Sequence, residues 1–322
     1  MAGLGPPNPA GVPAPLPWQA KKPPTSGRRW DPSVVFFLGL PALILVVFMI
    51  FPTIYTFLLS FNRGRRGEFT EWVGLNNYAN LFNDRSFINL GTFPPSGAIW
   101  NNVLWIILYV SVVIALGLVI AVLASRVRYE SIVKAIVFLP MAIAATALAV
   151  IWRFVYAPDP NTGLLNALID PITTGTVSFL GNPSLVNYSL IAAGIWGSVG
   201  FATVILSAAL KGIPAEILEA ARVDGGSERQ IFFRIIVPMV SLPMSVLAVT
   251  LIVNVIKLFD LIYIMTKGGP GVSSRVIAFT MYQEAIPGGL YGKGSAIAII
   301  MMLILIPIMV YNVRRFRTES VT

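Results

Sequence analysis

Residues 101–125 read NNVLWIILYVSVVIALGLVIAVLAS, a stretch in which no side chain carries a charge. A helix needs about 20 residues, at ~1.5 Å of rise each, to cross the ~30 Å hydrocarbon core of a bilayer. Lipid offers the backbone no hydrogen-bond partner, and the stretch lacks the alternation of polar and apolar residues that a barrel strand would show. The stretch therefore predicts a transmembrane helix.

The rest of the chain repeats this pattern. Five further apolar stretches are long enough to cross a membrane, and Lys257 and Asp260 interrupt only the fourth of them: 34–60, 135–152, 189–210, 239–265 and 295–313. Apolar residues make up 56% of the chain and charged residues 11%, whereas a soluble domain carries about 25% charged residues. This composition excludes a soluble enzyme and a nucleic-acid binder. It predicts an all-α polytopic membrane protein with six transmembrane helices.

The distribution of Lys and Arg predicts the orientation of these helices. The two terminal tails and the loops 126–134 and 211–238 hold 14 of the 23 basic residues, and the alternate segments hold 7. The chain is expected in the inner (cytoplasmic) membrane. Because cytoplasmic loops are enriched in Lys and Arg, both termini are expected in the cytoplasm. The net charge of +9 is then an orientation signal for the lipid bilayer, with no nucleic acid as partner.

Three regions follow from this topology. Residues 1–32 are rich in Pro, Gly and Ala and are expected to form a flexible cytoplasmic tail. Residues 33–317 are expected to form one six-span domain, and residues 318–322 a second cytoplasmic tail.

The loop 211–238 holds the densest cluster of charges and is itself expected to be helical. Pro214 suits a first helical position, and residues 215–223 are mostly strong helix formers. Gly225 and Gly226 should stop this helix, Ser227 should cap a second one, and Pro238 should end the second helix near the membrane. An apolar patch lies among the charges on the first helix, formed by Ile217, Leu218 and Ala221. From the residues alone, a helix that is merely solvated or lies on lipid headgroups and a helix that docks into a partner's groove are equally open.

The same loop resembles the EAA loop of ABC importer permeases. Glu219-Ala220-Ala221 is followed after three residues by Gly225, and after nine more by Ile235-Ile236-Val237-Pro238; Gly226 and Val237 depart from the usual Ala and Leu. Further segments resemble the carbohydrate-importing branch of these permeases: Phe138-Leu139-Pro140, Trp152, Gly163-Leu164-Leu165-Asn166, Phe259-Asp260 and Thr266-Lys267-Gly268-Gly269-Pro270. The likeness covers residues 33–317 and is greatest to the larger permease subunit of the maltose importer. The outward loops here are too short to hold that subunit's extra periplasmic domain.

The resemblance implies a type I permease bundle and a set of partners. A second six-span permease, two ATPase subunits and an extracytoplasmic sugar-binding protein are expected, with ATPase closure driving alternating access. It implies that Glu219 pairs with a basic residue of the ATPase and that Gly225 provides the turn, with further contacts from Ala220, Ala221 and Asp224. The chain itself is then a non-catalytic subunit without a metal site or other cofactor, and ATP and Mg²⁺ are bound by the partner ATPase. The solute is expected to be a di- or oligosaccharide such as an α-glucoside.

A candidate solute path lies in the interrupted stretch 239–265. Asn254, Lys257 and Asp260 recur every third residue and are expected to share one face of a helix. Charges within a span tend to face an aqueous cavity, and Phe259 and Tyr263 offer aromatic faces on which a sugar ring could stack. The competing interpretation is a structural Lys257–Asp260 pair. It is favoured for Asp260, and both interpretations remain open for Asn254 and Lys257.

Other functions remain as alternatives. An ABC importer for a polyol, a compatible solute or glycerol phosphate fits the same chain. A secondary transporter would need intramembrane carboxylates, for which only Asp260 qualifies. A membrane-embedded enzyme lacks candidates, because the chain has neither His nor Cys and no pair of carboxylates to act as acid and base.

Overall fold

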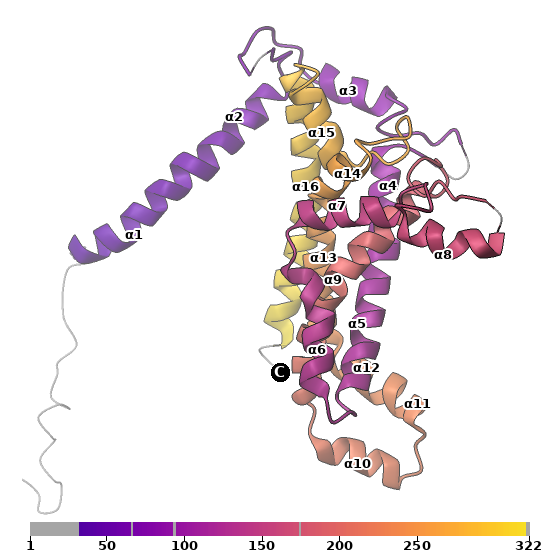
Figure 1. Cartoon of the computed structure of the whole chain (residues 1–322). Coiled ribbons are helices and arrows are strands. Elements are labelled where there is room, and N and C mark those ends of the chain that lie inside the picture. The colour runs from indigo at the N-terminus through magenta and orange to yellow at the C-terminus, as the bar shows by residue number, and fades with distance from the viewer. Residues whose placement is uncertain (1–31, 66, 93–94, 174, 320–322) are drawn as a thin grey trace, which may run out of the picture. The chain divides into compact units, whose positions relative to one another are not determined.

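The computed structural model describes residues 32–65, 67–92, 95–173 and 175–319 (Figure 1). Helices dominate these ranges, in which extended pairing is limited to isolated bridges such as Asn62 with Trp72. The chain divides into two compact units, Met1–Pro52 and Thr53–Thr322. The expectation of an all-α protein is therefore confirmed.

The first unit is apolar and helical where it is described. It contains α1 (Pro32–Leu45), a π-helical turn η1 (Val46–Ile50) and the first residues of α2 (Phe51–Leu59). The side chains of residues 36–52 are exposed. The candidate span Phe36–Leu59 matches the predicted stretch 34–60. The flexible tail predicted for residues 1–32 lies outside the described residues except for Pro32, which begins α1.

The second unit contains three further helices that are long and apolar enough to cross a membrane. One, Ala98–Ala124, combines α4 (Ala98–Trp105), the π-helical turn η2 (Ile106–Val110) and α5 (Ser111–Ala124). The others are α9 (Val186–Lys211) and the Tyr291–Arg315 part of α16 (Tyr291–Glu319). Thr318 and Glu319 still belong to α16, so the tail predicted to begin at residue 318 begins within a helix.

The remaining two predicted spans are bent rather than continuous. In the first, α6 (Glu130–Phe138) and the 3-10 turn η3 (Leu139–Ala142) meet α7 (Ala145–Val155) at 98°. Pro140 lies in the 3-10 turn, and Ala144 has an extended backbone with ψ of 142°. Proline lacks the N–H that a continuing helix would use, and the predicted span 135–152 is broken just after Pro140. The described residues thus contain four continuous candidate spans, and up to six if each bent pair counts as one span.

The second bent pair begins in the loop 211–238. There α11 (Glu228–Ile231), the π-helical turn η4 (Phe232–Ile236) and α12 (Val237–Met239) meet α13 (Ser241–Ile256) at 67°. The helical segment that begins at Glu228 ends at Met239, so the predicted end at Pro238 agrees to within one residue. The π-helical turn η4 ends two residues before this proline, and such turns are frequent where the regular helical hydrogen bonding is interrupted.

Close helix approaches build the core of the second unit around α9. A Cβ atom added at Gly200 would lie 2.4 Å from the Val137 carbonyl oxygen of α6, and one added at Gly197 would lie 2.5 Å from Leu148 of α7. On α5, Gly117 faces Ala202 of α9 in the same way. Small residues let transmembrane helices approach to backbone contact, so these glycines serve packing.

Two sets of connections lie at opposite ends of the second unit (Figure 1). At one end, near α3 (Asn76–Asn83) and α15 (Ile277–Ala285), Lys293 forms ion pairs with Asp84 at 3.2 Å and Glu284 at 2.9 Å. Partial burial raises the pKa of the Asp84 carboxyl, but hydrogen bonds from Ser86 and Lys293 outweigh this effect and lower the pKa below its ordinary value. The predicted outward loops 61–100 and 266–294 are therefore joined here.

At the other end, the predicted cytoplasmic loops 126–134 and 211–238 are joined. Arg126 forms an ion pair with Glu228, and Lys211 forms one with Glu130 at 3.2 Å. The grouping of loops agrees with the alternation that the basic residues predict. The remaining loop that is predicted to face outward contains α8 (Leu164–Thr173). Its buried Asn166 donates to the carbonyls of Ala157 and Val177.

A buried asparagine supplies hydrogen-bond partners for backbone groups at the end of α13. The helix α13 ends at Ile256, and a new helix, α14 (Asp260–Met265), begins four residues later. The Asn102 side chain, 2% exposed, donates to the Val255 carbonyl at 3.0 Å and accepts from the Ile277 amide at 2.8 Å. Each of these backbone groups would otherwise be buried without a partner in this region. Asn102 therefore joins the end of α13 to the start of α15.

Replacing Asn102 by Leu is expected to lower the free energy of unfolding by roughly 1–3 kcal/mol for each of the two backbone groups left unpaired. Asn76→Leu at an exposed position of α3 is the matched control and should change stability little. Thermal unfolding of the purified chain in detergent measures both. Equal midpoints for the two variants would contradict the role given to Asn102.

Candidate functional site

The densest charged segment folds as a helix, a glycine turn and a second helix. The first helix, α10 (Ala215–Val223), begins after Pro214 and covers the predicted range. Gly225 has φ of +80°, a left-handed conformation that glycine adopts without steric cost. The Gly226 amide donates to the Ala221 carbonyl at 2.9 Å, and the Gly225 amide donates to the Arg222 carbonyl at 3.0 Å. These two bonds form a Schellman motif, so the predicted helix stop at Gly225-Gly226 is confirmed.

The predicted cap of the second helix is confirmed as well. The Ser227 hydroxyl accepts from the Gln230 amide at 3.3 Å, and the Gln230 side chain accepts from the Ser227 amide at 2.8 Å. This reciprocal capping box satisfies two amides at the start of α11. Glu228 lies in the first turn, where a negative charge is favourable.

One carboxylate joins three segments of this loop region. Glu228 accepts from Arg222 of α10 at 2.9 Å and from Arg126, which follows α5. Such exposed ion pairs contribute little to stability individually. Beneath α10 lies a cavity of about 260 Å³, and Leu218 and Arg222 line it with residues of α5 and α9. The helix is thus attached to the bundle by its Leu218 and Arg222 side.

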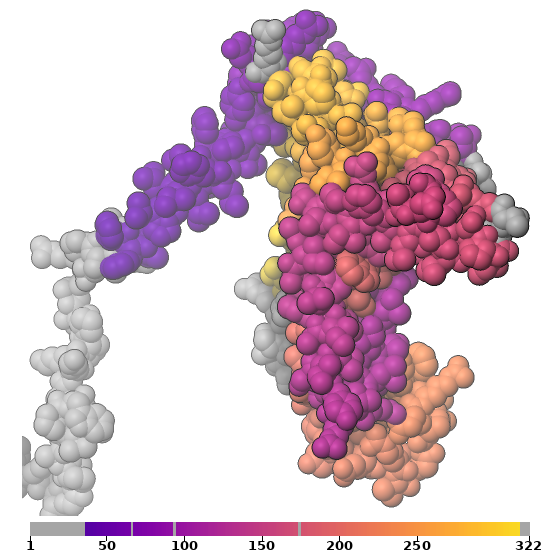
Figure 2. Space-filling view, viewed as in Figure 1, coloured from indigo at the N-terminus to yellow at the C-terminus, as the bar shows by residue number. Residues whose placement is uncertain are grey.

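The opposite side of α10 is exposed. Four of the five predicted docking residues are exposed and Ala221 is half-buried: Glu219, Ala220, Ala221, Asp224 and Gly225. No ion pair of the described residues involves Glu219 or Asp224. Figure 2 shows α10 and α11 projecting beyond α5 and α6 at this end. The exposed side therefore combines unpaired carboxylates with exposed backbone.

The predicted apolar patch is divided between the two sides of the helix. Ile217 is exposed, whereas Leu218 and Ala221 are half-buried against the bundle. The sequence interpretation missed Val223, whose side chain is 87% exposed at the last position of α10. An aliphatic side chain so exposed at the end of a helix is the stronger apolar contact point.

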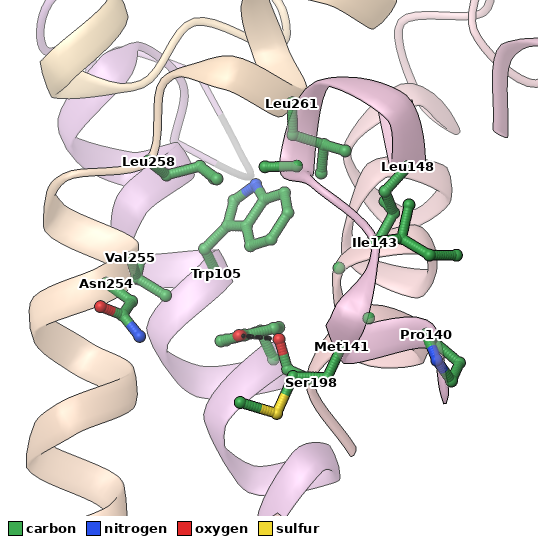
Figure 3. Close-up of a pocket in the computed structure, with 14 residues that line it drawn as sticks. Trp105, Pro140, Met141, Ile143, Leu148, Ser198, Asn254, Val255, Leu258 and Leu261 are labelled. Carbon is green, nitrogen blue, oxygen red and sulfur yellow. Dashed lines mark hydrogen bonds between the residues drawn. The ribbon is translucent and has the colours of Figure 1, made fainter. Parts of the chain in front are cut away.

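A pocket lies between the two interrupted spans. It has a volume of about 210 Å³. One wall comes from Pro140–Leu148 around the break before α7, and the facing wall comes from Asn254, Val255 and Leu258 at the end of α13 (Figure 3). Trp105 and Tyr109 of the second span and Ser198 of α9 complete it. The Tyr109 hydroxyl donates to the Ser198 hydroxyl at 2.7 Å.

The predicted solute-path residues do not all lie at this pocket. Asn254 lines it, whereas Lys257 and Phe259 line a separate cavity of about 330 Å³ together with Tyr282. Tyr263 stacks on Phe259 with ring centroids 5.2 Å apart. Asp260 is the first residue of α14.

The expectation that Asn254, Lys257 and Asp260 share a helical face is wrong. Lys257 caps the end of α13 and Phe259 precedes α14, so the helix is interrupted between the three positions. Lys257 and Asp260 are also not among the ion pairs of the described residues, so the alternative of a structural pair lacks a contact as well.

Sequence reasoning missed Trp105, Tyr109 and Ser198. They are uncharged positions inside predicted spans, where only the packing of α9 against the second span brings them together. A possible signal was the polar hydroxyl of Tyr109 within an apolar stretch. In the described part of the chain, no group of three acidic side chains gathers that could hold a metal ion.

Comparison with known proteins assigns this architecture to a class. Residues 113–316 match the family of binding-protein-dependent transport system inner membrane components. The chain belongs to this family and is a permease of the carbohydrate-uptake branch of ABC importers. Membership in this family rules out the alternative of a secondary transporter.

Individual relatives cover nearly the whole chain. It is 43% identical to the osmoprotective compounds uptake permease protein GgtC of Synechocystis sp., over 87% of this chain and 98% of that one. It is 38% identical to the alpha-glucoside transport system permease protein AglF of Rhizobium meliloti, over 88% of this chain and 82% of that one. It is 30% identical to the trehalose/maltose transport system permease protein MalF of Thermococcus litoralis, over 88% of this chain and 94% of that one.

A solved structure agrees with the fold. The crystal structure of a bacterial ABC transporter involved in the import of the acidic polysaccharide alginate matches with a TM-score of 0.74 and 23% identity, covering 89% of this chain and 96% of that chain. At this identity the likeness concerns the fold alone.

Replacing Gly225 tests the turn between α10 and α11. No atom lies within 4 Å of the place where a Cβ would stand, so the cost of a side chain is conformational only. Gly225→Ala is expected to cost about 1–2 kcal/mol of local stability, and Gly225→Asn less, because Asn tolerates the left-handed region. Hydrogen exchange of the α10 amides measures this. Faster exchange of the α10 amides in Gly225→Asn than in Gly225→Ala would contradict the left-handed turn assigned to Gly225.

Proposed function

We propose that this chain is the membrane-spanning subunit that carries a sugar-type solute across the cell membrane and couples that movement to ATPase closure through α10. The observation that carries the proposal is the exposed side of α10, with Glu219 unpaired while the opposite side is attached to the bundle. In this proposal Glu219 pairs with a basic residue of an ATPase subunit, and Ala220, Ala221 and Asp224 contact the same groove.

The geometry of the loop suits the transmission of force. A docked partner that pushes on α10 acts on the bundle through the cavity-lining residue Leu218 and through the contacts of Glu228 with Arg222 and Arg126. The Schellman motif and the capping box fix the angle between α10 and α11, so a displacement of α10 moves α11 with it. The span that begins at α11 continues into α13, whose end lines the pocket.

The sidedness and partners belong to the same proposal. The joined loops 126–134 and 211–238 face the cytoplasm, as do both termini, because these segments carry most of the basic residues. A second six-span permease completes the translocation path, and two ATPase subunits bind ATP and Mg²⁺, which this chain does not hold. An extracytoplasmic binding protein delivers the solute to the end that contains α3 and α15.

The solute we propose is a small glycoside. Relatives named for α-glucoside and for trehalose and maltose transport support a di- or oligosaccharide. The relative named for osmoprotective compounds supports a compatible solute as a second candidate. The pocket between the two interrupted spans is the proposed passage, with Asn254 as a polar contact. Lys257, Phe259, Asp260 and Tyr263 remain proposed residues of a neighbouring part of the path.

A charge reversal at the docking helix tests the coupling. Glu219→Lys is expected to abolish ATP-dependent uptake and to reduce the amount of ATPase that copurifies with the chain by about tenfold or more, since a buried charge pair is broken and reversed at the interface. Uptake of radiolabelled maltose or trehalose into proteoliposomes and quantitative mass spectrometry of the purified complex measure the two effects.

Glu216→Lys, one turn earlier on the same helix, is the matched control for the change in charge. It should affect both measurements less than Glu219→Lys. Normal uptake and normal ATPase copurification in Glu219→Lys would contradict the docking role of Glu219.

A further inference from the structure

The cavity of about 260 Å³ beneath α10, which we call the α10 cavity, gathers positive charge. Three basic side chains line it: Arg126, Lys211 and Arg222. They come from three separate segments, because Arg126 follows α5, Lys211 ends α9 and Arg222 lies in the last turn of α10. Among the residues that the structure describes, no carboxylate lines this cavity. The α10 cavity is therefore a basic site.

The carboxylates outside the cavity do not neutralise these cations. Glu228 pairs with both Arg126 and Arg222. Glu130 pairs with Lys211 at 3.2 Å and also with a second lysine on α6. Four cations thus share two carboxylates, which leaves a surplus of two positive charges around the cavity. An anion that enters the cavity is attracted by this surplus.

The two arginines keep donors for a further acceptor. A guanidinium has five N–H donors. Arg222 uses its Nε toward Glu228 at 2.9 Å, and Arg126 uses one Nη toward the same carboxylate. The cations are also within reach of a ligand, because the side chains of Arg126, Lys211 and Arg222 are 47%, 66% and 48% exposed. A phosphate group, with several charged oxygens, suits such a set of donors.

The α10 cavity lies at the level where two spans end. The candidate spans that contain α5 and α9 end at Ala124 and Lys211, and Arg126 follows the first of these ends by two residues. Val122 and Leu210, in the last turns of the same spans, form apolar lining of the cavity. Cations at the span ends therefore lie next to apolar side chains at the edge of the hydrocarbon. A phospholipid is complementary to both parts, whereas a free phosphate ion would use the cations alone.

The sidedness of the chain is consistent with a lipid ligand. The loops 126–134 and 211–238 are those that the basic residues place in the cytoplasm. The cytoplasmic leaflet carries anionic lipids, and basic pockets between transmembrane helices on this side bind lipid head groups.

We propose that the α10 cavity binds the phosphate group of an anionic phospholipid from the cytoplasmic leaflet, through Arg126, Lys211 and Arg222. The bound lipid joins α10 to the ends of α5 and α9, so that the membrane itself steadies this helix. The inference goes beyond the proposed function, from which it takes only the sidedness, and it involves neither ATP nor a transported solute.

The test measures lipid binding to the full chain, purified in mild detergent with whatever subunits accompany it. Phosphatidylglycerol, phosphatidylcholine and inorganic phosphate are titrated separately, and native mass spectrometry measures each affinity. Lys211→Gln and Arg222→Gln each remove one cation from the cavity. Arg229→Gln is the matched control, because Arg229 is an exposed cation of α11 that does not line the cavity.

The wild type is expected to bind phosphatidylglycerol about tenfold or more tightly than phosphatidylcholine. Lys211→Gln and Arg222→Gln should each weaken phosphatidylglycerol binding by about 3- to 10-fold, the effect of one basic side chain near an anionic lipid. Arg229→Gln should bind like the wild type. Glu228→Gln should bind at least as tightly as the wild type, because the surplus of positive charge rises when the shared carboxylate is removed.

Hydrogen exchange of the α10 amides gives a second readout. The full chain is placed in nanodiscs of phosphatidylglycerol or of phosphatidylcholine. Exchange should be slower in phosphatidylglycerol for the wild type, and this difference should shrink in Lys211→Gln, whose side chain is too exposed to be needed for folding.

Four outcomes would overturn the inference. Equal affinity of the wild type for the two lipids means that no anionic lipid is selected. An equal loss in Arg229→Gln and Lys211→Gln means that general surface charge attracts the lipid. Weaker binding in Glu228→Gln means that the cations serve their carboxylate partners only. Inorganic phosphate that displaces phosphatidylglycerol and protects α10 equally well means that the site takes a free anion. Because none of these measurements depends on transport, a failure of the proposed function would be seen separately, as absent ATP-dependent uptake.

Discussion

The structure depends on one constraint, which is that each backbone group at membrane depth must find a partner inside the protein. Continuous helices meet it by their own hydrogen bonds, but two spans of this chain are bent and one of these is interrupted again after Ile256. Asn102 supplies the missing partners at that second interruption, joining Val255 to Ile277. Its neighbour Asn101 bonds the carbonyls of Ser273 and Arg275. At this interruption, buried side-chain amides therefore hold the irregular backbone.

The same interruptions create the candidate passage. Non-helical backbone at membrane depth is tolerated where it is buried in protein or lines a cavity, and both breaks border the pocket that contains Trp105. The break before α7 provides one wall, and the end of α13 provides the other. Because α13 is continuous with the loop that carries α10, a movement at the docking end can alter the pocket. The bent span Glu228–Ile256 thus begins just after α10, the proposed coupling helix, and ends at the pocket.

Local chemistry made the docking loop predictable, while the pocket depended on tertiary packing. Pro214, Gly225 and Ser227 each determine a backbone conformation within a few residues, so the helix, the turn and the cap follow from the sequence. The spans followed from their apolar length in the same way. The interruption at Lys257 could not be predicted in this way. A charge within an apolar stretch indicates either a polar helix face or a helix end, and only the contact of Asn102 with Val255 decides between them. Trp105, Tyr109 and Ser198 come together through the close approach of α9, which no local pattern encodes.

The central claim is that this chain works as the permease of a larger importer, and purification of the chain from its native membrane tests it most directly. The chain is isolated in mild detergent, and mass spectrometry identifies the proteins that accompany it. The account predicts an ATPase and a second six-span permease in stoichiometric amounts. Recovery of the chain alone, from membranes in which other membrane complexes stay assembled, would contradict the account.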